Sequence, residues 1–126
     1  MIGKEINLLF AEDDLVNYMY LQEIISSDKN FKVKGFYNGK ELIDEFKKNK
    51  KYDIVILDIQ MPIMNGIDCM KQIKNLSPKT PVIAVTAFAM SNDKEKYLNM
   101  GFDDYISKPI NIDIFFSMIN EKMNKN

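Results

Sequence analysis

The sequence predicts an α/β domain built on one doubly wound parallel sheet, in which five strands alternate with five helices. The segment 54–57 is a run of four aliphatic residues, which is the pattern of a central parallel strand buried on both faces. Four shorter apolar runs accompany it, and segments with apolar residues at helical spacing lie between the runs. This alternation favours helices on both faces of the sheet. The 126 residues fit a single domain, 1–126, without a linker or repeat.

The first strand is expected over residues 5–11, where an apolar run stops at an acidic cluster. Asp14 is a suitable N-cap for the helix that follows. That helix should turn one face to the core, because four of its residues recur at the spacing i, i+3, i+4, i+7: Asn17, Tyr20, Leu21 and Ile24. A second short strand is expected over residues 32–37.

The second helix is predicted to begin at segment 38–41, which has the spacing of a capping box. Its predicted buried residues are Leu42, Ile43 and Phe46. The lysine-rich segment 47–51 is interpreted as a solvated connection to the central strand. After the central strand, a helix is predicted over 67–75 with Met70 and Ile73 buried. Two prolines beyond it end the helix.

The fourth strand is predicted over residues 82–85. Ser91 is placed to cap a mostly polar helix over 92–100, and Gly101 closes that helix as a C-terminal glycine. Residues 103–107 form a short last strand. These elements complete the alternation of strands and helices.

The last helix is predicted to start after Asn111, which is its N-cap. A continuous apolar stripe marks its core face: Ile112, Phe115, Phe116, Ile119 and Met123. Ile114 and Met118 fall off this stripe, which makes them candidates for contact with a partner or a second copy of the chain. The alternative is ordinary exposed apolar surface, which most proteins carry.

The composition of the chain excludes several classes of function. The formal net charge is −1, which predicts no direct nucleic-acid binding. There is no histidine, so acid–base or phosphotransfer chemistry must use other side chains or the histidine of a partner. Cys69 is the only cysteine and is interpreted as inert packing in a reducing compartment. Without a signal peptide or an apolar run of membrane-span length, we expect a soluble, cytoplasmic protein with no membrane contact.

Polar side chains stand at the carboxyl ends of four of the five predicted strands: Glu12 and Asp13, Asp58, Thr86, and Lys108. In a parallel sheet these strand ends share one edge, so the side chains converge on one crevice. Three carboxylates about 5 Å apart repel one another by a few kcal/mol per pair at an effective dielectric constant of about 20. A divalent cation removes this repulsion, and an all-oxygen donor set favours Mg²⁺, with Mn²⁺ as the alternative.

Each of these residue types suits a separate task in phosphoryl transfer. Asp58 is the best candidate nucleophile because it ends the central strand, while Asp13, helped by Glu12, is placed to hold the metal ion. Lys108 would contact phosphoryl oxygens as a point charge, and Thr86 would donate its hydroxyl to one of them. The structural alternative for each residue is a helix cap, strand filler or a surface lysine. That alternative requires independent accidents at four strand ends.

Four segments of the chain, taken in order, resemble the receiver domain of two-component response regulators. They are residues 12–14 (EDD), 57–66 (LDIQMPIMNG), 86–87 (TA) and 105–109 (YISKP). The resemblance covers nearly the whole chain. It implies a flavodoxin-like (βα)5 domain with the strand order 2-1-3-4-5 that is known for this class. One departure is Glu12, which stands where the family more often has aspartate.

The resemblance also implies a role for each site residue. Asp58 is the implied phosphoacceptor. The implied Mg²⁺ ligands are Asp13, Glu12 partly through water, Asp58, and the backbone carbonyl of Gln60. The implied phosphoryl-binding and switch residues are Thr86, Lys108, Tyr105 and the backbone amide of Ala87. A cis Lys108–Pro109 bond is a further implication.

The implied phosphodonor is a histidine kinase or a histidine phosphotransfer domain. The chain would then be a signalling phosphoacceptor that catalyses only its own phosphorylation and dephosphorylation, not an enzyme with a separate substrate. A downstream protein target, or a second copy, would bind the face formed by the helix 92–100, the strand 103–107 and the last helix. An exposed apolar stripe on the first helix is the candidate docking face for the donor, and peripheral packing under a loop is the alternative: Leu15, Tyr18, Met19 and Gln22. A stand-alone regulator and the receiver of a hybrid sensor histidine kinase both fit.

Three other classes of protein were weighed against this interpretation. A phosphatase of the haloacid dehalogenase type also uses a strand-terminal aspartate, but it requires a second aspartate where this chain has Gln60. A flavin carrier of flavodoxin type needs a phosphate-binding loop after the first strand, where segment 12–14 is acidic. A pseudo-receiver, which binds proteins without phosphotransfer, keeps the same motifs, so only a phosphorylation assay excludes it.

Overall fold

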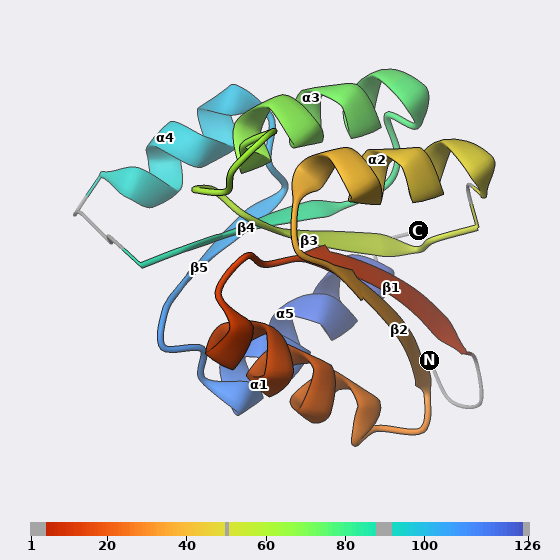
Figure 1. Cartoon of the computed structure of the whole chain (residues 1–126). Helices are drawn as coiled ribbons and strands as arrows, with labels where there is room; N and C mark the ends of the chain where they lie inside the picture. The colour runs from red at the N-terminus through yellow and green to blue at the C-terminus, as the bar shows by residue number, and fades with distance from the viewer. Residues whose placement is uncertain (1–4, 50, 88–91, 125–126) are drawn as a thin grey trace.

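Strand β3 (Ile54–Asp58) lies at the centre of a parallel sheet, and the other elements are arranged around it (Figure 1). The structure is a computed structural model that describes residues 5–49, 51–87 and 92–124. The sheet has the order β2-β1-β3-β4-β5, and every neighbouring pair is parallel. The other strands are β1 (Ile6–Ala11), β2 (Phe31–Phe36), β4 (Val82–Thr86) and β5 (Asp104–Ser107). The predicted flavodoxin-like fold and strand order are confirmed.

Five helices connect the strands and cover both faces of the sheet. They are α1 (Leu15–Ser26), α2 (Gly39–Lys48), α3 (Gly66–Leu76), α4 (Asp93–Met100) and α5 (Ile112–Met123). Helices α2, α3 and α4 lie on one face, and α1 and α5 lie on the other (Figure 1). In the described part of the chain, none of these helices is long and apolar enough to cross a membrane.

The core consists of two clusters of side chains that the sheet separates. Strand β3 contributes to both, because successive residues of a strand point to opposite faces. Val55 and Leu57 pack under α2, α3 and α4, while Ile54 and Ile56 pack under α1 and α5. All five residues of β3 are buried, which confirms the strand that the aliphatic run predicted. The strand therefore holds Asp58 at the end of a rigid central element.

The predicted core face of α1 is partly wrong. Leu21 and Ile24 are buried as predicted, but Ile25 completes the core face. Tyr20 is 39% exposed, because its position turns the ring toward the rim of the sheet, where its hydroxyl donates a hydrogen bond to the carbonyl of Ile110. Asn17 is only partly buried. Side-chain polarity therefore decides which neighbours of the apolar stripe enter the core.

Two predictions about the C-terminal half also need correction. Helix α4 begins at Asp93, with Asn92 as a cap that makes no side-chain hydrogen bond; Ser91 lies outside the described residues. On α5, Phe115 and Ile119 are buried as predicted, but Ile112 is 43% exposed, since it lies in the first turn beyond the carboxyl edge of the sheet. Met118 packs against the core cluster, so it does not lie off the core.

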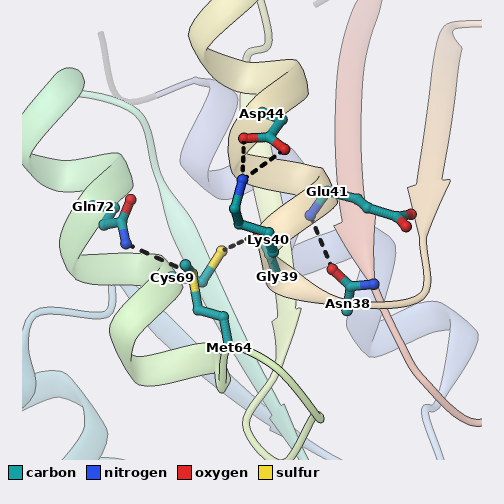
Figure 2. A network of polar contacts seen from close by, with 8 residues as sticks. All are labelled: Asn38, Gly39, Lys40, Glu41, Asp44, Met64, Cys69 and Gln72. Atoms are coloured by element: carbon teal, nitrogen blue, oxygen red, sulfur yellow. Dashed lines mark hydrogen bonds and ion pairs between the residues drawn. The ribbon is translucent and has the colours of Figure 1, made fainter.

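The start of α2 is tied to the loop that follows β3 and to α3 (Figure 2). Asn38 Oδ1 accepts a hydrogen bond from the Glu41 backbone N–H at 2.9 Å, as the capping-box spacing predicts. The buried Cys69 Sγ lies 3.7 Å from the Gly39 carbonyl oxygen, and a Cβ on Gly39 would lie 2.9 Å from the Met64 carbonyl oxygen. Glycine therefore allows α2 to approach this loop closely.

The connection between α2 and β3 and the bond before α5 agree with the sequence. Lys47, Lys48 and Lys51 are exposed, as predicted for a solvated connection; residue 50 lies outside the described residues. The Lys108–Pro109 peptide bond is cis, as the resemblance implied. The side chains of Asp14 and Asn111 cap α1 and α5 by accepting hydrogen bonds from Asn17 N–H and Ile114 N–H.

Candidate functional site

An acidic pocket lies at the carboxyl edge of the sheet, where the loops after β1, β3, β4 and β5 meet. Its volume is about 220 Å³. The residues that line it are Glu12, Asp13, Asp14, Asp58, Gln60, Thr86, Ala87 and Lys108. The parallel sheet brings these side chains together because all of the strand ends share one edge. All of the predicted site residues except Tyr105 line this pocket.

Asp58 ends β3, and the backbone that follows holds its carboxyl group in place. Asp58 Oδ1 accepts a hydrogen bond from the Gln60 backbone N–H at 3.2 Å. The chain then returns toward the strand, where the Gly66 N–H donates to the Ile59 carbonyl oxygen at 2.9 Å. A Cβ on Gly66 would collide with the carbonyl oxygen of Asp58. A glycine at this position therefore lets α3 begin directly against the strand end.

Lys108 joins two of the carboxyl groups. Its Nζ lies 2.7 Å from Glu12 Oε1 and 3.3 Å from Asp58 Oδ2. The first contact is an ion pair without hydrogen-bond geometry, so Glu12 Oε1 has no hydrogen-bond partner among the described residues. Glu12 Oε2 accepts from the Asp14 backbone N–H at 3.1 Å. The Lys108 backbone N–H donates to the Thr86 carbonyl oxygen at 2.8 Å, which continues the pairing of β5 with β4.

Burial and charge shift the pKa values of this group. Burial and the neighbouring carboxyl group of Glu12 raise the pKa of Asp58 to about 7, although Lys108 opposes the shift. Burial alone would lower the pKa of Lys108, but its contacts with Glu12 and Asp58 outweigh burial and raise it. One ammonium group thus faces two buried carboxyl groups, and the site carries excess negative charge when both are ionised.

The carboxyl groups of Glu12, Asp13 and Asp58 fit a divalent metal ion. One oxygen of each lies within 4.8 Å of the others. Glu12 and Asp58 are buried, whereas Asp13 is exposed, so the cluster opens toward solvent on the Asp13 side. Carboxylate oxygens are ligands that Mg²⁺ prefers in proteins, so this donor set suits that ion.

The switch residues implied by the resemblance lie on β4 and β5. Thr86 is buried at the end of β4, and Ala87 is exposed. Tyr105 lies two residues before Ser107, the partner of Thr86 in the sheet, and its ring stacks on Tyr97 with centroids 5.7 Å apart. Its hydroxyl is buried and has no hydrogen-bond partner within the described residues. Burial, with the nearby charge of Asp93, raises the pKa of Tyr105.

Two residues near the site lie where the sequence did not predict them. Asp14 was expected only as a helix cap, yet it also lines the pocket. Tyr20 was expected in the core, yet its hydroxyl reaches the loop that carries Lys108. The Asp14 signal was present in the acidic triplet, whereas a contact between residues 90 positions apart leaves no local signal.

The fold and the pocket define a domain of the CheY-like class. The sequence model of the response regulator receiver domain family matches residues 8–120, so this chain belongs to that family. It is a receiver domain of two-component signalling.

Similar proteins include a hybrid histidine kinase, a sensor protein and a response regulator of known structure. Hybrid signal transduction histidine kinase I of Dictyostelium discoideum is 35% identical over 94% of this chain, and the aerobic respiration control sensor protein ArcB of Escherichia coli K12 is 34% identical over 92%. The chain spans 7% and 15% of the length of these two relatives. The crystal structure of a two-component response regulator from Clostridium difficile is 26% identical, with a TM-score of 0.86, and the match covers 96% of this chain and 98% of that one.

Proposed function

We propose that this receiver domain accepts a phosphoryl group on Asp58 from a phosphohistidine. The observation that carries this proposal is the placement of the Asp58 carboxyl group. It ends the central strand in an acidic pocket, 3.3 Å from the Lys108 ammonium group and within 4.8 Å of carboxylate oxygens from Glu12 and Asp13. A nucleophile, a cation and metal-binding groups are the parts that phosphoryl transfer requires.

In the proposed reaction, a carboxylate oxygen of Asp58 attacks phosphorus in line with the bond to the donor's imidazole nitrogen. The O–P bond forms as the N–P bond breaks, the imidazole takes the electron pair and a proton from solvent, and Asp58 becomes an acyl phosphate. Lys108 neutralises charge on the phosphoryl oxygens. The Thr86 hydroxyl and the Ala87 backbone N–H donate hydrogen bonds to those oxygens. Hydrolysis of the acyl phosphate returns the carboxylate.

We assign the metal site to Asp13, Glu12, Asp58 and the backbone carbonyl of Gln60. Mg²⁺ bound there would offset the charge of three carboxylates and of the incoming phosphoryl oxygens. We assign Asp13, which is exposed, as the direct ligand, and Glu12, which is fully buried, as a ligand beside it that acts partly through water. Mn²⁺ satisfies the same donor set.

The partners follow from the absence of histidine in the chain. The donor histidine must belong to a histidine kinase or a histidine phosphotransfer domain, on another chain or another domain. Of the four residues in the candidate docking stripe on α1, Leu15 and Met19 are exposed, while Tyr18 and Gln22 are partly buried. The first two therefore offer apolar surface to the donor. The domain acts on itself and on no separate substrate, and its lone buried Cys69 suits the cytoplasm.

We assign the output surface to α4, β5 and α5. Ile114 is 55% exposed on α5, so it can contact a downstream protein or a second copy of the chain. Phosphorylation would shift this face between two conformations by a coupling free energy of about 1–3 kcal/mol.

The first experiment is intact mass spectrometry after incubation with acetyl phosphate and Mg²⁺. We expect a gain of one phosphoryl group in the wild type, and no gain in Asp58→Asn or in the presence of EDTA. A folded wild type that gains nothing from acetyl phosphate or from a phosphorylated histidine donor would establish a pseudo-receiver. A gain in Asp58→Asn would move the acceptor to another residue.

A further inference from the structure

Tyr20 links helix α1 to the loop that carries Lys108. Its hydroxyl donates a hydrogen bond of 3.1 Å to the backbone carbonyl oxygen of Ile110. The two residues are 90 positions apart in the sequence, so this contact joins the first helix to the segment between β5 and α5. Ile110 is buried against the cluster under α1 and α5, two residues beyond Lys108.

The backbone on either side of Lys108 is anchored differently. On the N-terminal side, the Lys108 N–H is fixed by the Thr86 carbonyl oxygen at 2.8 Å. On the C-terminal side, Pro109 has no N–H to donate and is exposed. The Tyr20 hydroxyl bond to Ile110 is the polar contact that follows. It therefore closes the short segment whose centre is Lys108.

The Lys108 side chain is not held by close packing on the side that faces α1. A hollow of about 350 Å³ separates α1 from the segment, and its lining is Val16, Asn17, Tyr20, Lys108, Pro109 and Ile110. A lysine side chain is flexible and carries its charge at the end of a four-carbon stem. The distances of 2.7 Å and 3.3 Å from Nζ to Glu12 and Asp58 therefore depend on where the backbone of Lys108 is held.

We propose that Tyr20 is a positioning residue for Lys108 in phosphoryl transfer to Asp58. Its hydroxyl holds the segment 108–110 against α1, so that the Lys108 ammonium group stays between Glu12 and Asp58. This inference rests on the proposed function, because it assigns Lys108 to the phosphoryl group. Tyr20 itself does not line the acidic pocket.

The test is Tyr20→Phe, which removes the hydroxyl and keeps the ring. Tyr52→Phe is the matched control, because the Tyr52 hydroxyl also donates a hydrogen bond, to Glu45, at the opposite edge of the sheet. With acetyl phosphate and Mg²⁺, we expect the phosphorylation rate constant of Tyr20→Phe to fall about fivefold, the effect of one hydrogen bond. With acetyl phosphate in large excess, so that phosphorylation is much faster than hydrolysis, the final extent of phosphorylation should stay unchanged. The dissociation constant for Mg²⁺ should also stay unchanged, and Tyr52→Phe should match the wild type.

A double-mutant cycle separates positioning from a general loss of folding. If Tyr20 acts through Lys108, then Tyr20→Phe should have no further effect in a Lys108→Ala background. A general loss of folded protein would instead lower the extent of phosphorylation and would persist in that background. An equal loss in both backgrounds, or an unchanged rate in Tyr20→Phe alone, would overturn the proposal.

A measurement without phosphorylation keeps this test separate from the proposed function. The side-chain NMR resonance of Lys108, assigned by its loss in Lys108→Ala, should shift in Tyr20→Phe and stay in place in Tyr52→Phe. A wild type that accepts no phosphoryl group would refute the proposed function even if this resonance shifts. A resonance that does not move would refute the positioning role even if the wild type is phosphorylated.

Discussion

One ammonium group, that of Lys108, balances two buried carboxyl groups in this structure. Its Nζ contacts both Glu12 and Asp58, yet burial and the charge of Glu12 still raise the pKa of Asp58 to about 7. The carboxyl group is therefore held at a free-energy cost when it is ionised. Without a metal ion, this site should weaken the fold at neutral pH.

Asp58→Asn should stabilise the metal-free protein at high pH. The pKa of Asp58 in the folded state, about 7, lies above its usual value of 3.8, so the wild type loses stability as the pH rises from about 4 through 7. At pH 8 the variant should gain about 1–3 kcal/mol in free energy of unfolding. At pH 5 the difference should be smaller, because the carboxyl group is protonated in the folded state there and only the unfolded state has ionised.

Urea unfolding in EDTA at both pH values measures this difference. Glu23→Gln, which removes an exposed carboxyl group on α1, controls for the change in net charge. If Asp58→Asn and Glu23→Gln behave alike at pH 8, the buried carboxyl pair does not weaken the fold.

The sequence predicts which residues meet at the site but not how they pair. Strand ends in a parallel sheet share one edge, so the positions of Glu12, Asp58 and Thr86 follow from the alternation of elements alone. The pairing of Lys108 with Glu12 depends on side-chain lengths and on the path of one loop. The Tyr20 contact depends on the angle between α1 and the sheet, which no local pattern records.

The loop between β3 and α3 contains a strained turn at Ile63. The Met64 N–H donates to the Pro62 carbonyl oxygen at 2.8 Å, which closes a three-residue turn around Ile63 at a φ of 71°. Turns of this kind with positive φ are rare, and a β-branched residue there is a steric outlier. The Ile63 side chain is 79% exposed, so packing does not repay this strain.

Ile63→Gly should therefore stabilise the protein by about 1 kcal/mol, because glycine adopts positive φ without strain. Chemical denaturation of the variant and the wild type measures the difference. Ile63→Ala is the control. It keeps a Cβ, so it should recover little of this stability. A destabilised Ile63→Gly would show that the Ile63 side chain stabilises the loop despite its exposure.

The capping residues offer a comparison between two helices. Asn111 Oδ1 accepts a hydrogen bond from Ile114 N–H at 3.0 Å, whereas Asn92 caps α4 without a side-chain hydrogen bond. Asn111→Ala should cost about 1 kcal/mol of stability, and Asn92→Ala should cost a few tenths at most. Thermal unfolding of the two variants measures both effects. Equal losses would contradict the assigned difference between the caps.

At the level of elements, strong patterns were predicted well and helix ends were not. The predicted core residues of α2 and β3 are correct. Nearly every apolar residue in these two elements is buried, so the sequence pattern is clear. Helix α4 is mostly polar, and its start was placed one residue early because a serine signal outweighed the weak apolar pattern. Ile112 was assigned to the core because periodicity does not show where a helix extends past the sheet.

Mg²⁺ should stabilise the whole molecule through the acidic pocket. A ligand at about 100 times its dissociation constant adds about 2.7 kcal/mol to the free energy of unfolding. We expect the midpoint of thermal unfolding to rise with Mg²⁺ in the wild type and to rise much less in Asp13→Asn. Lys51→Gln, at the opposite edge of the sheet, should respond like the wild type. An equal response in Asp13→Asn would exclude Asp13 as a ligand.

The organisation of residues 1–126 as one domain stays a prediction. The fold could be predicted from the sequence because all five strand–helix units repeat one pattern, and each unit agrees with its neighbours. It could not reach the electrostatics of the pocket, since those depend on burial at the level of single atoms.

The sheet separates the two core clusters, so substitutions in one cluster should change stability independently of substitutions in the other. Ile25 of α1 packs against one face of the sheet, and Ile43 of α2 packs against the other face. Because the sheet separates them, the losses from Ile25→Val and Ile43→Val should add to within about 0.5 kcal/mol in the double variant. The side that α1 and α5 cover can thus diverge between relatives while the packing beneath α2, α3 and α4 stays intact. Substitutions on one face of the sheet can therefore change the binding specificity of the molecule while the packing energy of the other face stays unchanged.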